Sequence, residues 1–130
     1  MLKLFRCLAL GCFLSAASAG ASEWVPLLQV TNLVQAIQDL QKAGYWVHGA
    51  DMSGESIHKV DLHGRLGVVL GREGEGLHDL VKHTCDGLIR VPTVGHIDSL
   101  NVSVAAGVIM YEIRRQGESN GSADRPVINP

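Results

Sequence analysis

Three glycines follow a short apolar run in the middle of the chain: Gly71, Gly74 and Gly76 come after residues 66–70, Leu-Gly-Val-Val-Leu. A glycine has no Cβ, so its backbone can approach a ligand more closely than that of other residues. In parallel α/β sheets, ligands bind at the edge where strands end and such loops begin. The loop therefore predicts a small-molecule site, although a tight turn would also use glycine. It matches neither the Rossmann glycine pattern nor a P-loop.

Polar side chains stand at two places that could carry chemistry. Glu73 lies inside the glycine loop with Glu75 close by, which suggests either acid–base work or a solvated loop face. Ser99 and Asn101 lie where a long helix is predicted to begin, and the N–H groups at a helix start favour polar or anionic groups. Simple capping of the helix by Ser99 would explain that residue equally well.

The six histidines and three cysteines form no metal-ligand pattern. His78 and His83 would not share a helical face, and the cysteines form no C-x-x-C pair. Ser99, His96 and Asp98 could supply a Ser/His/Asp nucleophile, but no G-x-S-x-G motif accompanies them. We therefore expect no metal site, and thiols that stay reduced.

The hydrophobic pattern predicts strands that alternate with helices. We expect strands over residues 24–30, 45–50, 66–71 and 87–91, and helices over residues 31–43, 76–84 and 99–116. Residues 51–64 are predicted to form a loop with one helical turn near residues 56–60. The alternation predicts an α/β domain with a mostly parallel sheet and flanking helices. The last helix is apolar almost all round, so we expect it to be enclosed or dimerised.

The charge balance limits how the chain could bind nucleic acid. Eleven basic and thirteen acidic side chains give the 130 residues a net charge of -2. A domain that holds nucleic acid by bulk electrostatics is usually clearly basic. Any such binding must therefore use a local patch, a partner or a further segment.

Two blocks resemble the signature motifs of one family. Residues 70–77, Leu-Gly-Arg-Glu-Gly-Glu-Gly-Leu, resemble motif 2 of the SpoU (TrmH-type) RNA ribose 2′-O-methyltransferases. Residues 91–112, VPTVGHIDSLNVSVAAGVIMYE in one-letter code, resemble motif 3. The likeness covers about Ala16 to Gly117, and it is strongest to the bacterial 23S ribosomal RNA guanosine 2′-O-methyltransferases.

This resemblance implies a SPOUT-type α/β fold with a C-terminal trefoil knot, and a homodimer packed through the last helix. It implies S-adenosylmethionine as cofactor, RNA (above all ribosomal RNA) as substrate, and no membrane partner. Transferred position by position, it implies cofactor contacts at Leu70, Gly71, Gly74, Val91 and Leu100. It implies catalytic roles near the reacting centre for Glu73, Ser99 and Asn101.

The chain departs from the family at motif 1, because no Asn-x-Gly-x-x-x-Arg occurs in it. The resemblance ties the arginine of that motif to the proton of the ribose hydroxyl, and neither Arg72 nor Arg90 stands in its place. We therefore expect residues 16–117 to be an N-terminally truncated methyltransferase domain. Its function is either RNA 2′-O-methylation, which could be lost in this chain alone, or non-catalytic binding of S-adenosylmethionine and dimerisation.

The N-terminus has the pattern of a signal peptide. Lys3 and Arg6 precede the apolar run of residues 7–14, and Ala-Ser-Ala follows at residues 17–19. The run is too short to span a bilayer. Because the family likeness includes this cleavage site, we expect a cytoplasmic protein with an unmatched segment at residues 1–15. A secreted α/β protein with coincidental motifs is the remaining alternative. Residues 118–130 are predicted to be a disordered tail.

Overall fold

The computed structural model describes residues 28–72, 75–94 and 100–119. The chain divides into two compact units, Met1–Asn32 and Leu33–Pro130. All helices and strands of the described residues belong to the second unit. In chain order they are α2 (Leu33–Lys42), β1 (Trp46–Ser56), β2 (Leu66–Val69), α3 (Asp79–Thr84), β3 (Gly87–Arg90) and α4 (Val102–Ser119). Residues 24–27 of the first predicted strand lie outside the described residues, and residues 28–30 are not a strand. Residues 1–15 and 120–130 lie outside the described residues as well.

The three strands form a parallel sheet in the order β2-β1-β3, with β1 in the middle. Residues Trp46–Gly49 of β1 pair in register with Leu66–Val69 of β2. Asp86, just before β3, reinforces the start of β1: its carboxylate accepts a 2.7 Å hydrogen bond from Val47 N, and its own N–H donates to Val47 O. The parallel sheet predicted from the alternation of elements is thereby confirmed.

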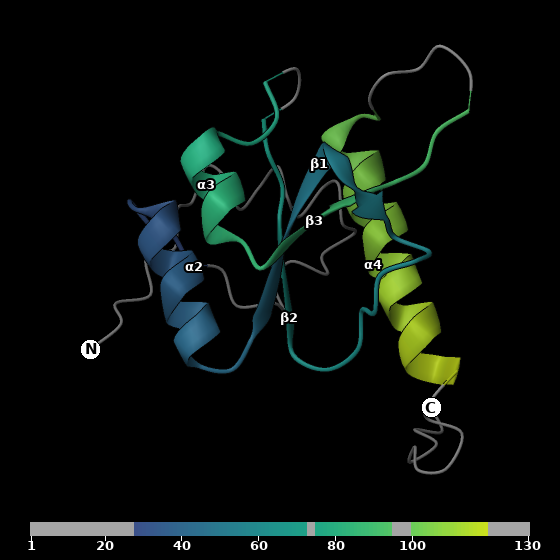
Figure 1. The fold of residues 1–130 in the computed structure, drawn as a ribbon, viewed down its shortest axis with the longest axis horizontal. Coiled ribbons are helices and arrows are strands. Elements are labelled where there is room, and N and C mark those ends of the chain that lie inside the picture. Colours follow the sequence, from purple (N-terminus) through teal and green to yellow (C-terminus); the bar gives the residue numbers. More distant parts are fainter. Residues whose placement is uncertain (1–27, 73–74, 95–99, 120–130) are drawn as a thin grey trace. The chain divides into compact units, whose positions relative to one another are not determined.

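Apolar side chains fill two cores, one on each face of the sheet. On the face covered by α2 and α3, the buried residues are Ile37, Val47, Val69, Leu77 and Val81. On the other face, α4 packs on the sheet, and the buried residues are Ile57, Leu62, Ile89 and Ile109. Figure 1 shows α2 and α3 on one side of the strands and α4 on the other, so the predicted flanking helices are also confirmed.

The first two described helices differ in how well the sequence predicts them. α2 ends as predicted, because Gly44 adopts a φ of +89° and lets Tyr45 N donate to Leu40 O at 3.0 Å. α3 begins at Asp79 rather than at residue 76. The helical spacing of Leu77, Leu80 and Val81 would place all three on one face, but Leu80 is 65% exposed.

β1 is longer than predicted, and the loop expected from residue 51 begins only after Ser56. The strand leaves its ladder with β3 after Ala50, which pairs with Ile89, and rejoins the same Ile89 at Glu55. Residues 51–54 are therefore an excursion from the strand, which we call the β1 excursion. The helical turn predicted near residues 56–60 is a single turn, closed by Lys59 N donating to Ser56 O at 2.9 Å.

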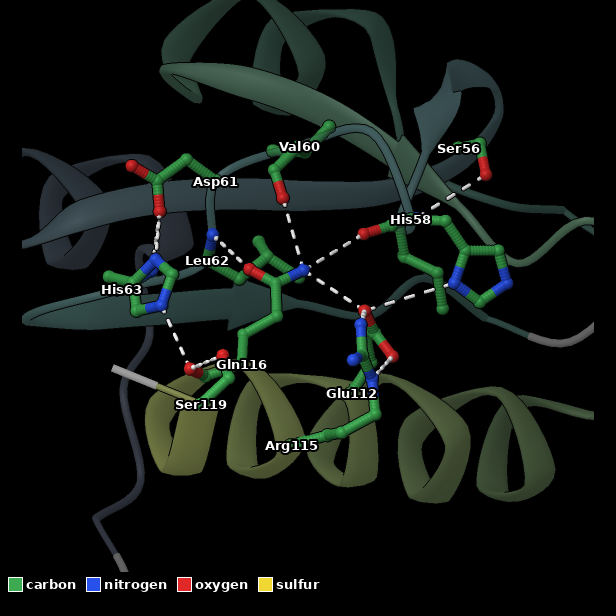
Figure 2. A network of polar contacts seen from close by, with 11 residues as sticks. Ser56, His58, Val60, Asp61, Leu62, His63, Glu112, Arg115, Gln116 and Ser119 are labelled. Atoms are coloured by element: carbon green, nitrogen blue, oxygen red, sulfur yellow. Dashed lines mark hydrogen bonds and ion pairs between the residues drawn. The ribbon is translucent and has the colours of Figure 1, made fainter. Parts of the chain in front are cut away.

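Buried polar side chains hold the C-terminal half of α4 against residues 57–63, as Figure 2 shows. Gln116, 9% exposed, accepts a hydrogen bond from Leu62 N at 3.0 Å. Its amide nitrogen donates to Ile57 O, Val60 O and Glu112 Oε1 at 3.3, 3.2 and 3.0 Å. Since buried polar groups are costly unless they are hydrogen-bonded, this set of bonds fixes where α4 lies on the sheet.

Charged groups extend this network to the surface (Figure 2). Hydrogen bonds from Arg115, at 2.9 and 2.7 Å, and then from Gln116 lower the pKa of Glu112 from its ordinary value to about 2. His58 Nδ1 lies 3.8 Å from the Glu112 carboxylate. His63 contacts Asp61 through Nδ1, and its Nε2 lies 2.9 Å from Gln116 O. The contact with Asp61, followed by that with Gln116, raises the pKa of His63.

Among the described residues, no helix is both long enough and apolar enough to cross a membrane.

Candidate active site

A cavity of about 270 Å³ lies where the strands of the sheet end. Its wall draws on four separated parts of the chain, namely Ala50–Met52 at the β1 excursion, Leu70–Arg72 with Glu75 and Gly76 in the glycine loop, Ile89–Val91 at the end of β3, and Leu100, Val102, Ala105 and Ile109 at the start of α4. Most of this lining is aliphatic, with charged groups at a few positions. Such a wall suits a ligand with a flat apolar part and a few polar groups.

The glycine loop returns upon itself at this cavity. A Cβ placed on Gly71 would lie only 2.3 Å from the carbonyl carbon and oxygen of Gly76. Gly76 N donates to Arg72 O at 2.9 Å, and Gly76 has a φ of +68°. Gly71 is therefore required by the close crossing of two backbone segments, and Gly76 by a left-handed turn.

The start of α4 is capped by Asn101. The first hydrogen bond within the helix runs from Ala105 N to Asn101 O at 2.9 Å, and the Asn101 side-chain oxygen accepts from Ser103 N at 2.9 Å. Both bonds are those of an N-cap residue. The prediction that Ser99 caps this helix was therefore wrong by two positions.

Charged residues at the cavity differ in their partners. Asp51 Oδ2 pairs with Lys82 Nζ of α3 at 2.9 Å, and its Oδ1 accepts from the backbone and side chain of Ser53. Burial acts to raise the pKa of Asp51, but the hydrogen bonds from Ser53 and Lys82 outweigh it and lower that pKa. Arg72 and Arg90 take part in none of the ion pairs found among the described residues. The cavity thus carries the guanidinium groups of Arg72 and Arg90, the carboxylate of Glu75, and the Asp51 carboxylate that is paired with Lys82.

Four of the five residues predicted to contact a cofactor line this one cavity: Leu70, Gly71, Val91 and Leu100. Gly74 lies outside the described residues, as do Glu73 and Ser99 of the predicted catalytic set. Asn101, the third of that set, directly follows Leu100 but is not among the lining residues. His96 and Asp98 also lie outside the described part of the chain.

Comparison with known proteins shows the family to which this chain belongs. The family model described as SpoU rRNA Methylase family matches residues 10–111. The chain belongs to the SpoU rRNA Methylase family. The 23S rRNA (guanosine-2′-O-)-methyltransferase RlmB of Xanthomonas campestris pv. campestris is 50% identical over 100 residues, which are 76% of this chain and 40% of that protein. RlmB of Coxiella burnetii is 46% identical over 103 residues, 78% of this chain and 41% of the relative.

Solved structures of the family have the same fold. The TrmH/SpoU tRNA modifying enzyme of A. aeolicus superposes with a TM-score of 0.78 at 30% identity, covering 88% of this chain and 59% of that one. The SpoU methyltransferase AviRb of Streptomyces viridochromogenes, solved in complex with AdoMet, superposes with a TM-score of 0.68 at 26% identity, covering 78% of this chain and 40% of AviRb. The family and the α/β fold predicted from motifs 2 and 3 are thereby confirmed. The chain spans less than half the length of the RlmB relatives it matches.

Sequence reasoning missed several residues of this SpoU-family cavity. The polar pattern of residues 51–64 predicts a loop and gives no reason to place Asp51 and Met52 at a site, whereas both belong to the β1 excursion and line the cavity. Ala105 and Ile109 could have been found, since they stand four residues apart on the helix that follows motif 3's polar residues. Within the described residues, no group of three His, Cys, Asp or Glu side chains could hold a metal ion. Cys85 is a free thiol whose pKa is raised by burial.

Proposed function

We propose that this chain binds S-adenosylmethionine in the cavity at the strand ends, and that it serves the 2′-O-methylation of a ribose in RNA, with ribosomal RNA as the substrate class. One observation carries the proposal: three separate segments of the chain line one cavity, and they contribute Leu70 with Gly71, Val91, and Leu100. Membership of the SpoU rRNA Methylase family supports it, and so does the name of the RlmB relatives. The work of such a protein would be in the cytoplasm, where ribosomal RNA is made and used in bacteria.

The lining residues fit such a cofactor. Leu70, Val91 and Leu100 offer aliphatic contacts to an adenine ring, and Gly71 and Gly76 bring backbone without side chains to the cavity wall. When bound, S-adenosylmethionine would supply an electrophilic methyl group on a sulfonium. The protein's task is then to align a ribose hydroxyl with that methyl group and to accept the hydroxyl proton, and neither step needs a metal.

Three residues are proposed for that task. We assign catalytic roles to Glu73, Ser99 and Asn101, as the family motifs imply. Asn101 stands at the positive end of the α4 dipole, because it is the N-cap of an 18-residue helix. That end of a helix stabilises negative charge, such as the charge that develops on the 2′-oxygen. Gly74 is proposed as a further cofactor contact in the glycine loop.

The proposal also has a structural part. We propose that residues 16–117 form the methyltransferase domain, that its C-terminal segment has the SPOUT trefoil knot, and that α4 packs against a second copy of the chain. On α4, the exposed apolar side chains are Val104, Val108, Met110 and Tyr111, which are 51, 37, 62 and 71% exposed. Val104, Val108 and Tyr111 follow one another at spacings of four and three residues and so share one face, whereas Met110 lies about 100° or more around the helix from them. The buried residues Ile109, Glu112 and Gln116 are centred on a different part of the helix surface. Large apolar side chains gathered on one helix face mark a docking surface.

Calorimetric titration with S-adenosylmethionine tests the cofactor site. We expect saturable binding by the wild type and loss of binding in Val91→Asp, which puts a carboxylate into the aliphatic wall. Val94→Asp is the matched control, because Val94 is 94% exposed and lines no part of the cavity. Absence of binding by a folded wild-type chain would overturn the cofactor proposal. If Val91→Asp and Val94→Asp bind S-adenosylmethionine with equal affinity, the cofactor site does not include Val91.

Methyl transfer and dimerisation need separate assays. Transfer of a labelled methyl group to 23S ribosomal RNA, blocked on substrates whose riboses are 2′-deoxy, would support the enzymatic proposal. Binding without transfer would favour the alternative of a non-catalytic module that binds S-adenosylmethionine. Light scattering should show a dimer that Tyr111→Glu dissociates. Leu80→Glu, which changes an exposed leucine of α3, should leave the dimer intact.

A further inference from the structure

The β1 excursion forms one wall of the cavity and is held in place from within. The pairing of Ala50 and then Glu55 with the same Ile89 leaves residues 51–54 outside the ladder. At the return point, a Cβ on Gly54 would lie 2.5 Å from Ile89 N, so the chain there presses on the backbone of β3. Asp51 and Met52 of this excursion line the cavity. The shape of the wall therefore depends on what holds the excursion.

The Asp51 carboxylate is the centre of those contacts. Its Oδ1 accepts hydrogen bonds from Ser53 N at 3.0 Å and from Ser53 Oγ at 2.6 Å, which closes a turn within the excursion. Its Oδ2 pairs with Lys82 Nζ of α3 at 2.9 Å. The two side chains are 11 and 29% exposed, so water screens this pair far less than it screens a surface pair. One carboxylate thus joins the excursion to α3.

The glycine loop directly precedes α3 in the chain, so the ion pair between Asp51 and Lys82 lies next to the end of the loop. Gly76, at the end of the loop, has a φ of +68°, and a Cβ on it would lie 3.6 Å from Asp51 Oδ2. The next residue, Leu77, packs so closely on Gly49 of β1 that a Cβ there would lie 2.7 Å from Leu77 Cδ1. At its other end, the loop follows β2, whose Val69 pairs with the same Gly49. Both ends of the glycine loop are therefore attached to β1 at residues 49–51.

We propose that Asp51 and Lys82 are positioning residues that hold the glycine loop and the β1 excursion in the shape that binds the cofactor. The effect of this ion pair on cofactor binding rests on the function proposed above, whereas its effect on the shape of the loop does not. Neither residue touches the reacting atoms in this proposal. They act through Gly76, whose N–H is held by Arg72 O at 2.9 Å, and through the wall at residues 51–52.

The test uses three variants of the full chain and one control. Asp51→Asn keeps an oxygen that can accept from Ser53 but removes the charge facing Lys82. Lys82→Met removes the other partner with little change in length, and Lys82→Arg restores the charge. The matched control is Lys59→Met, because Lys59 pairs with Glu55 at 3.9 Å on the surface, where the side chains are 76 and 59% exposed.

Two readouts separate loop positioning from general stability. The first is hydrogen exchange of the Gly76 amide by NMR in the ligand-free protein, with the Leu62 amide, bound to Gln116 Oε1 on the other face of the sheet, as internal reference. The second is the dissociation constant for S-adenosylmethionine. In Asp51→Asn and Lys82→Met we expect Gly76 exchange and the dissociation constant each to rise about tenfold. We expect Leu62 exchange to stay unchanged, Lys82→Arg to behave as wild type, and Lys59→Met to change neither readout.

Each outcome decides one of the two proposals. Unchanged Gly76 exchange in both charge-removing variants overturns the positioning role, whatever the affinities are. Equal acceleration at Gly76 and Leu62 also overturns it, because that result means general destabilisation. If the wild type does not bind S-adenosylmethionine, the proposed function fails, and Gly76 exchange alone decides the positioning role. If Asp51→Asn does not fold, the comparison of Lys82→Met with Lys82→Arg carries the test.

Discussion

Replacing Gly71 by alanine tests the close crossing at the cavity directly. A Cβ at this position would lie 2.3 Å from the carbonyl carbon and oxygen of Gly76 and 2.8 Å from Leu77 N. Ordinary van der Waals contact begins near 3.4 Å, so the two backbone segments would have to separate by about 1 Å. The obstacle is backbone on both sides, which cannot turn aside as a flexible side chain can. The glycine pattern predicts a close approach of this backbone to a ligand, whereas a side chain at Gly71 would first meet the backbone of Gly76.

The expected cost of Gly71→Ala follows from that geometry. Forcing one extra carbon into a closed contact destabilises proteins by about 1–3 kcal/mol, and a clash with backbone belongs at the upper end, about 3 kcal/mol. The free energy of unfolding from urea denaturation measures this cost. S-adenosylmethionine affinity should fall in the same variant even at temperatures where the protein is fully folded, because Gly71 and Gly76 both line the cavity.

Gly117→Ala provides the control for this prediction. A Cβ on Gly117 meets nothing within 4 Å, and the residue lies within α4. Alanine should therefore stabilise the protein slightly, by about 0.5–1 kcal/mol, because it is the better helix former. If Gly71→Ala unfolds with a free energy within about 0.5 kcal/mol of wild type and binds the cofactor normally, the crossing does not exist as described.

Three further predictions concern α4. Gln116→Leu should lower the free energy of unfolding by about 2–4 kcal/mol, measured by urea denaturation, because Leu62 N and two carbonyl oxygens would lose their buried partner. Asn101→Ala should lower the free energy of unfolding by about 1 kcal/mol because the N-cap is lost, while Asn101→Ser should keep the wild-type value. If the serine variant still transfers methyl groups, Asn101 does not belong to the catalytic set. Glu112 has its folded pKa lowered to about 2, so its contribution is present above its ordinary pKa of 4.5 and is lost as the pH falls from there toward 2. Denaturation at a series of pH values should show this loss, and Glu112→Gln should flatten it; an equal acid slope in the variant would assign the loss to other carboxylates.

The sequence predicts this molecule well where local chemistry and tertiary structure agree. The end of α2 follows from Gly44, since only a residue that tolerates a φ of +89° closes the helix there. β2 and β3 follow from short apolar runs that are buried between layers of helix. Motifs 2 and 3 bring Leu70, Gly71, Val91 and Leu100 to one edge because parallel strands end at the same side of a sheet.

The failures have different physical causes, and partners far away in the sequence are the first of them. Residues 51–56 are mostly polar and contain a glycine, so they carry no strand signal, yet β3 pairs with Glu55 and Ser56, and Lys82 pairs with Asp51. Leu80 has the spacing of an inner-face residue, but α3 is only six residues long and its core contacts are made by Val81. Asn101 rather than Ser99 caps α4, and both have side chains suited to that role, so sequence alone could not choose between them.

The buried polar side chains of α4 fix the position of the helix along its own axis on the sheet. The N-terminal half of its inner face, with Val102, Ala105 and Ile109, is aliphatic and would tolerate sliding along the sheet. Gln116 does not, because a slip of one turn, about 5.4 Å, would separate it from Leu62, Ile57 and Val60 together. Buried polar groups of this kind select one alignment among several of similar apolar burial. The position of Asn101, between the lining residues Leu100 and Val102, is thus set from the far end of the helix, about 20 Å away.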